Sequence, residues 1–297
     1  MMNASRAGKG LFCICSLFFS VLASAALSDV FPTDFVALPT GQMTASLYLI
    51  ESKQAGTWSN GHRLGDAQLS ATVAAARFSR YYRIGEFKVA AVFVLSSLDM
   101  ALSGNTIPAN VTRNRSGLGD LRLGGTVWLI DDVENRHYLG LNLMEIFPSG
   151  RYDSHELANP GENRRRQGLM LGWIKGLSDN FTVEATPELA WYGSNSANYP
   201  GSVRLDQHRS VSLTTYLRYR FAPQWYGFVG AQVNEGGETA LNGHAQNNPI
   251  HGRRFYLGGT YILDKDNGIN LRLARDDSPL TGLKTTQEIA LRWISRY

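Results

Sequence analysis

The sequence predicts an all-β protein, a single antiparallel transmembrane β-barrel of about 12 strands with short periplasmic turns and long extracellular loops. Three observations support this prediction. Apolar and polar residues alternate with period two along a dozen short segments, the connections between these segments are alternately long and short, and the chain starts like a secretory signal peptide. We therefore expect the protein in the bacterial outer membrane.

Composition and charge argue against several other classes. Residues 1–25 contain the basic Arg6 and Lys9, an apolar run and Ala23-Ser24-Ala25, which is the pattern of a cleaved signal peptide. Without them the formal charge falls from +4 to +2, with 27 basic against 25 acidic residues, so no basic surface indicates nucleic-acid binding. Both cysteines lie in this leader, which excludes disulfides and thiolate sites from the mature protein. No other apolar run is long enough for a transmembrane helix.

The barrel is predicted to span 42–297, after an irregular segment at 26–41. Prolines and a glycine interrupt any period in that segment, and two positions suit it, the barrel mouth or the lumen. The first three strands are predicted at 42–52, 67–80 and 87–95, with long loops at about 53–66 and 97–116. In the third strand Phe87, Val89 and Phe93 share one face and Lys88 points the other way.

The clearest hairpin spans 117–147 and supplies the fourth and fifth strands. Leu121 and Leu123 fall on one face of its first strand, while Asp120 and Arg122 fall on the other. A charged turn of about six residues leads into the return strand at 137–147, and a long loop follows to about residue 165. A strand with one apolar and one polar face separates two different solvents.

The remaining seven strands continue the pattern to the end of the chain. They are predicted at about 166–175, 183–191, 211–221, 225–234, 254–263, 269–273 and 288–297. Pro187 lies inside the strand predicted at 183–191, and it predicts a bulge or a locally open ladder there. Six long connections and five short ones then alternate along the chain.

A soluble β-sandwich would produce the same alternation along each strand. The signal peptide and the alternating connections favour the barrel, and so do aromatic residues near strand ends, where outer-membrane barrels carry interfacial girdles. These aromatic residues are Tyr81, Tyr82, Trp128, Tyr138, Phe147, Trp191, Tyr192, Phe221, Trp225, Tyr226 and Phe255.

Charged residues in the polar phase are predicted to face the lumen, because an Arg or Lys on the lipid face near the bilayer midplane costs roughly 2–4 kcal/mol. Besides Asp120, they are Lys88, Arg122, Glu184, Glu188, Arg218, Arg220, Arg254, Arg272, Glu288 and Arg292. Two interpretations fit this set. They line a pore that favours anionic or polar solutes, or they form a ladder of ion pairs that fills a narrow barrel.

Several motifs resemble the outer-membrane porins named for the meta pathway of phenol degradation. They are the GLGDLRLGG run at 117–125, FPSGRYD at 147–153, NPGENR at 159–164 and the N-terminal FPTDFVALPTG. The resemblance implies a channel or transporter for a small-molecule solute, hydrophobic or aromatic compounds included. In such a passive channel we expect the loops after strands three and five to constrict or cap the mouth. The last strand, with Trp293 and Tyr297, resembles the signal read by the barrel-assembly machinery. Outer-membrane lipids and lipopolysaccharide are the other expected partners.

Two alternatives from other classes remain. His208 and Ser210 have the spacing found in outer-membrane lipid hydrolases, but Ser210 shares the lumen phase of Ser212, so no enzymatic activity is predicted. A structural or adhesin barrel is the third possibility. Asp264, Asp266 and Gly268 resemble part of a calcium loop without its twelfth-position glutamate, and the histidines are scattered over loops, so neither a metal nor a cofactor is predicted.

Overall fold

The computed structural model describes residues 30–59, 61–279 and 281–297, and the predicted signal peptide lies outside them. Within these ranges the chain forms strands, turns and loops, and it contains no helix that could cross a membrane. The strands are β1 (Met43–Ser59), β2 (His62–Ile84), β3 (Phe87–Ser103), β4 (Asn114–Leu118), β5 (Leu121–Asp132), β6 (His137–Phe147), β7 (Arg166–Gly176), β8 (Phe181–Tyr192), β9 (Asn195–Asn198), β10 (Val203–Gln207), β11 (Ser210–Ala222), β12 (Trp225–Gly236), β13 (Thr239–Leu241), β14 (His244–Ala245), β15 (Ile250–Ile262), β16 (Asn267–Pro279) and β17 (Gly282–Arg296).

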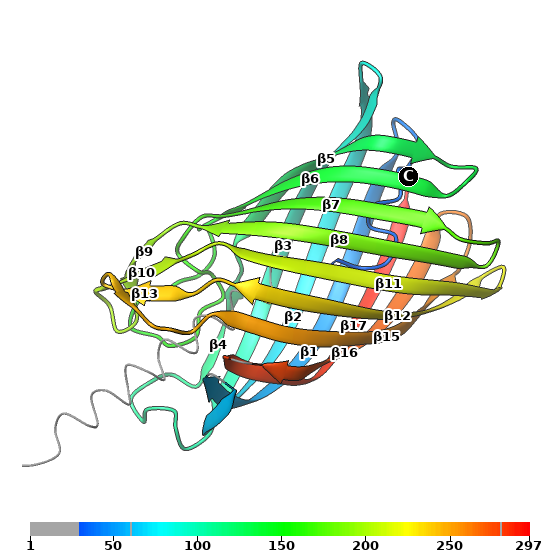
Figure 1. Cartoon of the computed structure of the whole chain (residues 1–297). Helices are drawn as coiled ribbons and strands as arrows, with labels where there is room; N and C mark the ends of the chain where they lie inside the picture. The colour runs from blue at the N-terminus through cyan, green and yellow to red at the C-terminus, as the bar shows by residue number, and fades with distance from the viewer. Residues whose placement is uncertain (1–29, 60, 280) are drawn as a thin grey trace, which may run out of the picture.

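Thirteen of these segments form one closed antiparallel sheet (Figure 1). Its order is β2-β1-β17-β16-β15-β12-β11-β8-β7-β6-β5-β3-β4, and pairing of β2 with β3 closes it. Because β4 and β5 both pair with β3 and are separated only by Gly119 and Asp120, they are two parts of one barrel strand. The predicted barrel of twelve antiparallel strands is therefore confirmed. Closure pairs the backbone groups of every strand, which a bilayer requires.

The predicted alternation of long and short connections is wrong at two places. β1 and β2 continue as a paired ribbon to Ser59 and His62, where a long loop at 53–66 was expected. Similarly, β16 reaches Pro279 and β17 starts at Gly282, so the last extracellular connection is short. Polar residues extend these strands because the ribbons project beyond the membrane, where neither face needs to be apolar.

A second, four-stranded sheet is built by the extracellular connections on either side of the β11–β12 hairpin. Its order is β14-β13-β10-β9, and it lies beyond the barrel wall in Figure 1. Val203, Leu205 and Leu241 form its small buried cluster. The sequence predicted irregular loops here, because strands of two to five residues carry too few positions to show a period.

The outward face of the barrel is apolar and the inward face carries the charges. Leu49, Leu217 and Leu257 on three different strands are exposed, whereas Arg272 and Arg292 are only 1% and 2% exposed. Pro187 lies in β8, and two residue pairs are missing there from the ladder between β7 and β8. The register is the same before and after this gap, so the ladder is locally open, as predicted, and contains no bulge.

Candidate substrate cavity in the lumen

The N-terminal segment, residues 30–41, enters the lumen and forms a floor across its inner part (Figure 1). Its central carboxylate, Asp34, accepts a hydrogen bond from Arg292 over 2.5 Å and another from Arg77 over 3.2 Å. The backbone amide of Thr33 donates to Glu184 over 2.9 Å. These contacts come from β2, β8 and β17, so the segment is held from several sides of the barrel.

Two phenylalanines fix the same segment by packing. Phe31 is fully buried with the guanidinium carbons of Arg272 and Arg292 at 3.9 and 4.6 Å from its ring centre, within the range of cation–π attraction. Phe35 lies against Gly172, where an added Cβ would come within 1.9 Å of the ring. Trp128 Nε1 donates to the Phe35 carbonyl over 2.9 Å. The position left open by the sequence is therefore the lumen.

Three aromatic residues that were predicted as interfacial girdles are instead part of this floor. Tyr81, Trp128 and Tyr138 are less than 8% exposed and form one cluster with Phe35. Their side chains point inward because they share the strand phase that faces the lumen. The position of an aromatic residue near a strand end therefore did not show whether its side chain lies in the interfacial girdle or in the lumen.

One side of the lumen is filled by ion pairs. Arg254 lies 2.7 Å from Asp276 and 3.4 Å from Glu288, and Arg272 lies 3.0 Å from Glu288. Arg218 pairs with Glu184. On β8, β11 and β15 to β17, the ion-pair ladder thus describes the lumen better than an open charged pore does.

The other side contains a cavity of about 220 Å³ between the floor and the extracellular loops. Apart from Arg77 and Ser96, its wall on β2 and β3 is aliphatic, and methionines together with the polar Arg122, Thr126 and Asn142 from β5 to β7 line the rest. The wall residues are Leu69, Ala71, Val73, Ala75, Val94, Leu98 and Met100, and those facing them are Thr126, Asn142, Met144 and Met170. A concave, mostly apolar space with a few polar groups is typical of a small-molecule site.

The ten predicted lumen residues occupy three regions. Arg122 and Glu288 line the cavity. Glu184, Arg218, Arg254, Arg272 and Arg292 belong to the ion pairs or the floor, and Glu188 is buried on β8. Lys88, which pairs with Asp131 over 2.5 Å, and Arg220, which donates to the Asp179 carbonyl over 3.2 Å, lie at the inner end.

Sequence reasoning missed the aliphatic wall and Asp34. A signal for the wall was present, because β2 and β3 are apolar on both faces around Val73 and Phe93 where the other strands alternate. A strand that is apolar on both faces is expected to be covered on both sides. Asp34 lies in an irregular segment, so no period could show where its side chain points.

The outer end of the cavity is closed by an apolar cap. The loop at 104–113 contributes Ile107 and Val111, and the loop at 148–165 contributes Leu157 and Ala158. They form one cluster with Leu69 and Met100 of the aliphatic wall, and with Tyr199 and Leu283. These are the loops that were predicted to cap the mouth.

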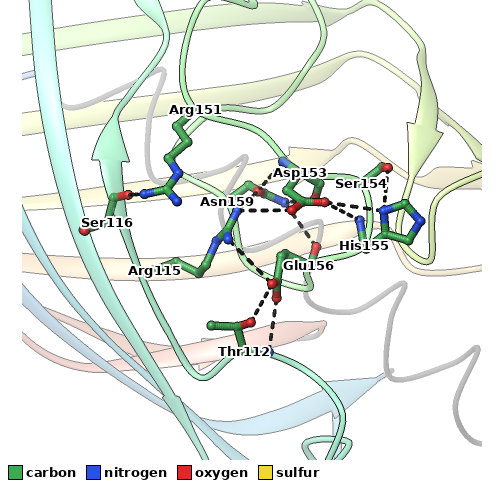
Figure 2. A network of polar contacts seen from close by, with 9 residues as sticks. All are labelled: Thr112, Arg115, Ser116, Arg151, Asp153, Ser154, His155, Glu156 and Asn159. Carbon is green, nitrogen blue, oxygen red and sulfur yellow. Dashed lines mark hydrogen bonds and ion pairs between the residues drawn. The ribbon is translucent and has the colours of Figure 1, made fainter.

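A polar network holds the two cap loops together (Figure 2). Glu156 accepts hydrogen bonds from the amide and hydroxyl of Thr112 over 3.1 and 2.5 Å, and Arg115 lies 3.6 Å away. The Asp153 amide donates to Asn159 over 2.9 Å. The backbone amide of His155 donates to the Asp153 carboxylate and holds its pKa below the ordinary range.

Asp120 ties the larger cap loop to the break between β4 and β5. Its carboxylate accepts hydrogen bonds from the amides of Gly150 and Glu162 over 2.8 and 2.9 Å. A Cβ on Gly150 would lie 2.7 Å from the Gly119 carbonyl carbon, so this close approach requires glycine. This close contact between the GLGD and FPSG motifs explains why glycine is needed at position 150.

The hydrolase alternative has no geometric support. The Ser210 hydroxyl lies 2.7 Å from the hydroxyl of Tyr192, while His208 is exposed and its amide donates to the Glu238 carbonyl. Among the described residues, no group of three His, Asp or Glu side chains is placed to hold a metal ion.

A closed barrel with an apolar outer face and an internal cavity has the architecture of an outer-membrane channel. A sequence profile of the family described as "Putative MetA-pathway of phenol degradation" matches residues 53–287, and the chain belongs to this family. The fold is similar to that of the COG4313 outer membrane channel from Pseudomonas putida F1, with a TM-score of 0.85 and 25% identity over 91% of this chain and 100% of that one.

Other solved barrels are similar in fold alone. The β domain of the Bordetella autotransporter Brka has a TM-score of 0.53 at 11% identity, covering 86% of this chain and 99% of its own. The translocator domain of the autotransporter NalP from Neisseria meningitidis has a TM-score of 0.50 at 13% identity, covering 94% and 96%. No curated protein matches the sequence significantly. The family match confirms the resemblance, and the Pseudomonas channel supports a transport channel of the outer membrane over an enzyme.

Proposed function

We propose that this channel carries small apolar molecules, aromatic compounds among them, passively across the outer membrane. The aliphatic wall of the cavity is the observation that supports this most. An apolar solute gains about 25 cal/mol for each Å² of surface that it removes from water, whereas a sugar or an inorganic ion gains nothing from such a wall. The family's description, which names phenol degradation, agrees with this class of solute.

Passage requires both closures of the cavity to open transiently. On the outside, the loops at 104–113 and 148–165 must separate, and on the inside the segment at 30–41 must shift. Both closures combine apolar packing with ion pairs and hydrogen bonds, and the polar contacts can exchange with water as the closures open. No residue does chemistry in this mechanism.

We also infer the surroundings of the barrel. Exposed leucines such as Leu47, Leu143 and Leu291 suit contact with outer-membrane lipids and lipopolysaccharide. The last strand, which ends with Trp293 and Tyr297, suits recognition by the barrel-assembly machinery. Crosslinking from Tyr297 during assembly tests this second inference, and a product that lacks the assembly machinery contradicts it.

Uptake into liposomes tests the proposed solute class. Refolded protein is reconstituted, and influx of a neutral aromatic compound is compared with protein-free liposomes. Ala71→Trp fills the cavity and should reduce influx to the protein-free rate, whereas Ala74→Trp adds the same side chain to the lipid face of the same strand and should leave influx unchanged. If wild-type protein gives no influx of any neutral aromatic compound, the proposal is wrong.

A further inference from the structure

Three arginines share one row of the barrel wall. The register pairs Arg77 with Val94, Val94 with Arg122, Arg122 with Ile146, and Ile146 with Arg166, so arginine and aliphatic residues alternate across five barrel strands. Directly paired residues project from the same face of a sheet, and this face is the lumen, where Ile146 and Arg166 are buried. Because neighbouring strands are about 4.8 Å apart, successive arginines of the row start about 10 Å apart.

The row connects the outer loops with the floor of the cavity. Arg166 is the first residue of β7, next to the larger cap loop, and Arg122 lines the cavity. Arg77 also lines the cavity and reaches Asp34 in the floor, with a quarter of its side chain accessible. A solute that crosses the cavity therefore passes one guanidinium after another.

The outer end of the row contains buried hydrogen-bond donors that a ligand could use. Arg166 Nε and Nη2 and Arg164 Nη1 are buried and have no hydrogen-bond partner within the described part of the chain. Both guanidinium groups lie over the ring of Tyr192, at 5.6 and 5.0 Å from its centre. Buried charged donors are costly to leave unpaired, and an anionic ligand would satisfy them.

Carboxylates also face this space, and arginines pair with three of them. Arg77 and Arg292 share Asp34, Arg254 and Arg272 share Glu288, and Arg164 and Arg166 share Glu162. Glu188 is buried on the neighbouring strand β8, and Asp120 accepts two backbone amides. The cavity lining contains two arginines and two carboxylates, and each of these carboxylates already pairs with two arginines, so the lining suits an anion better than a cation.

We propose that this arginine row binds the carboxylate of an apolar organic acid, an aromatic acid for example, and guides it through the cavity. The proposal rests on the proposed function and names its substrate class. The planar guanidinium groups of Arg166, Arg122 and Arg77 bind a carboxylate by two parallel hydrogen bonds, while the apolar body lies against the aliphatic wall. A multiply charged ion would lose more hydration in this wall than one carboxylate does.

The test compares benzoate with its neutral analogue benzamide in liposome influx. Arg122→Met keeps the apolar stem and removes the charge, and it should lower benzoate influx about tenfold while changing benzamide influx less than about twofold. Arg165→Met is the matched control, because Arg165 is exposed next to the row and stacks on Phe147. Arg122→Lys should restore benzoate influx in part. Heat-modifiable gel migration shows whether each variant forms the barrel.

The outcomes separate the two proposals. Equal loss of both solutes in Arg122→Met, or no loss of either, overturns the arginine row. Influx of benzoate without influx of benzamide in wild-type protein contradicts the proposed neutral solutes and supports the row. Reversal potentials in a planar bilayer provide an independent measurement: preference for benzoate over potassium should fall in Arg122→Met and not in Arg165→Met, and an unchanged preference overturns the row.

Discussion

Arg292 on the last strand and Asp34 in the N-terminal segment are 258 positions apart in sequence and 2.5 Å apart in the lumen. The same carboxylate accepts a hydrogen bond from Arg77 on β2, which is separated from the last strand only by β1. The first described turn of the chain is thereby joined to its last strand, and one carboxylate links the floor of the cavity to two strands of the wall.

Asp34→Asn should therefore loosen the floor. Removing one partner from a buried ion pair typically costs about 3–5 kcal/mol, because the remaining charge stays buried without compensation. Here the segment can shift out of the lumen, so we expect higher single-channel conductance in planar bilayers. Asp99→Asn, at an exposed position on β3, is the control. Equal conductance of all three proteins would show that Asp34 does not hold the floor.

Gly172→Ala should displace the floor by a different mechanism. The new Cβ would lie 1.9 Å from the Phe35 ring, so the phenylalanine must move. We expect increased conductance and a changed fluorescence of Trp128, which donates to the Phe35 carbonyl. Adding Phe35→Ala removes the clash but also the packing, so the double variant should stay open. Gly252→Ala has free space around it and should behave like wild type.

Glu156→Gln should speed opening of the outer cap. The carboxylate accepts two hydrogen bonds from Thr112 and faces Arg115, and the amide retains only part of these contacts. For a partly exposed pair the expected weakening is about 1 kcal/mol, which corresponds to a rise of about fivefold in the rate of solute influx. Glu134→Gln in a periplasmic turn changes charge equally and should leave influx unchanged. A slower influx in Glu156→Gln would contradict this role of the network.

Acidification should loosen the cap only below about pH 4, the ordinary range of an aspartate. The amide of His155 lowers the pKa of Asp153, so the ionised carboxylate stabilises the folded loop, and Arg115 at 4.0 Å adds to this. A lowered pKa means that this stabilisation is complete above the ordinary aspartate pKa and is lost as the pH falls through the folded value. Channel noise should thus be constant from pH 7 to 5 and rise only below about pH 4, while Asp153→Asn is noisy throughout. A transition near pH 6 would contradict this role of Asp153.

Most of the barrel could be predicted because the residue pattern of each strand reflects the environments on its two faces. Lipid on one side and a polar lumen on the other impose period two on every segment, as at Leu123 and Arg122, and no knowledge of neighbouring strands is needed to see it. The same local reasoning predicted the inward phase of charges such as Arg272 and Glu288. It was wrong for the loop at 53–66, because a ribbon that projects into water needs no apolar face.

The cavity could not be derived in this way. Whether Arg254 fills the lumen or binds a solute depends on Asp276 and Glu288, which reach it through the register of three adjacent strands. The position of Asp34 depends on arginines from strands near both ends of the chain, and the row of Arg77, Arg122 and Arg166 exists only in the paired sheet. Alternation along one strand specifies which face a side chain occupies, but the distances across the lumen follow from closure of the barrel, which no single strand encodes.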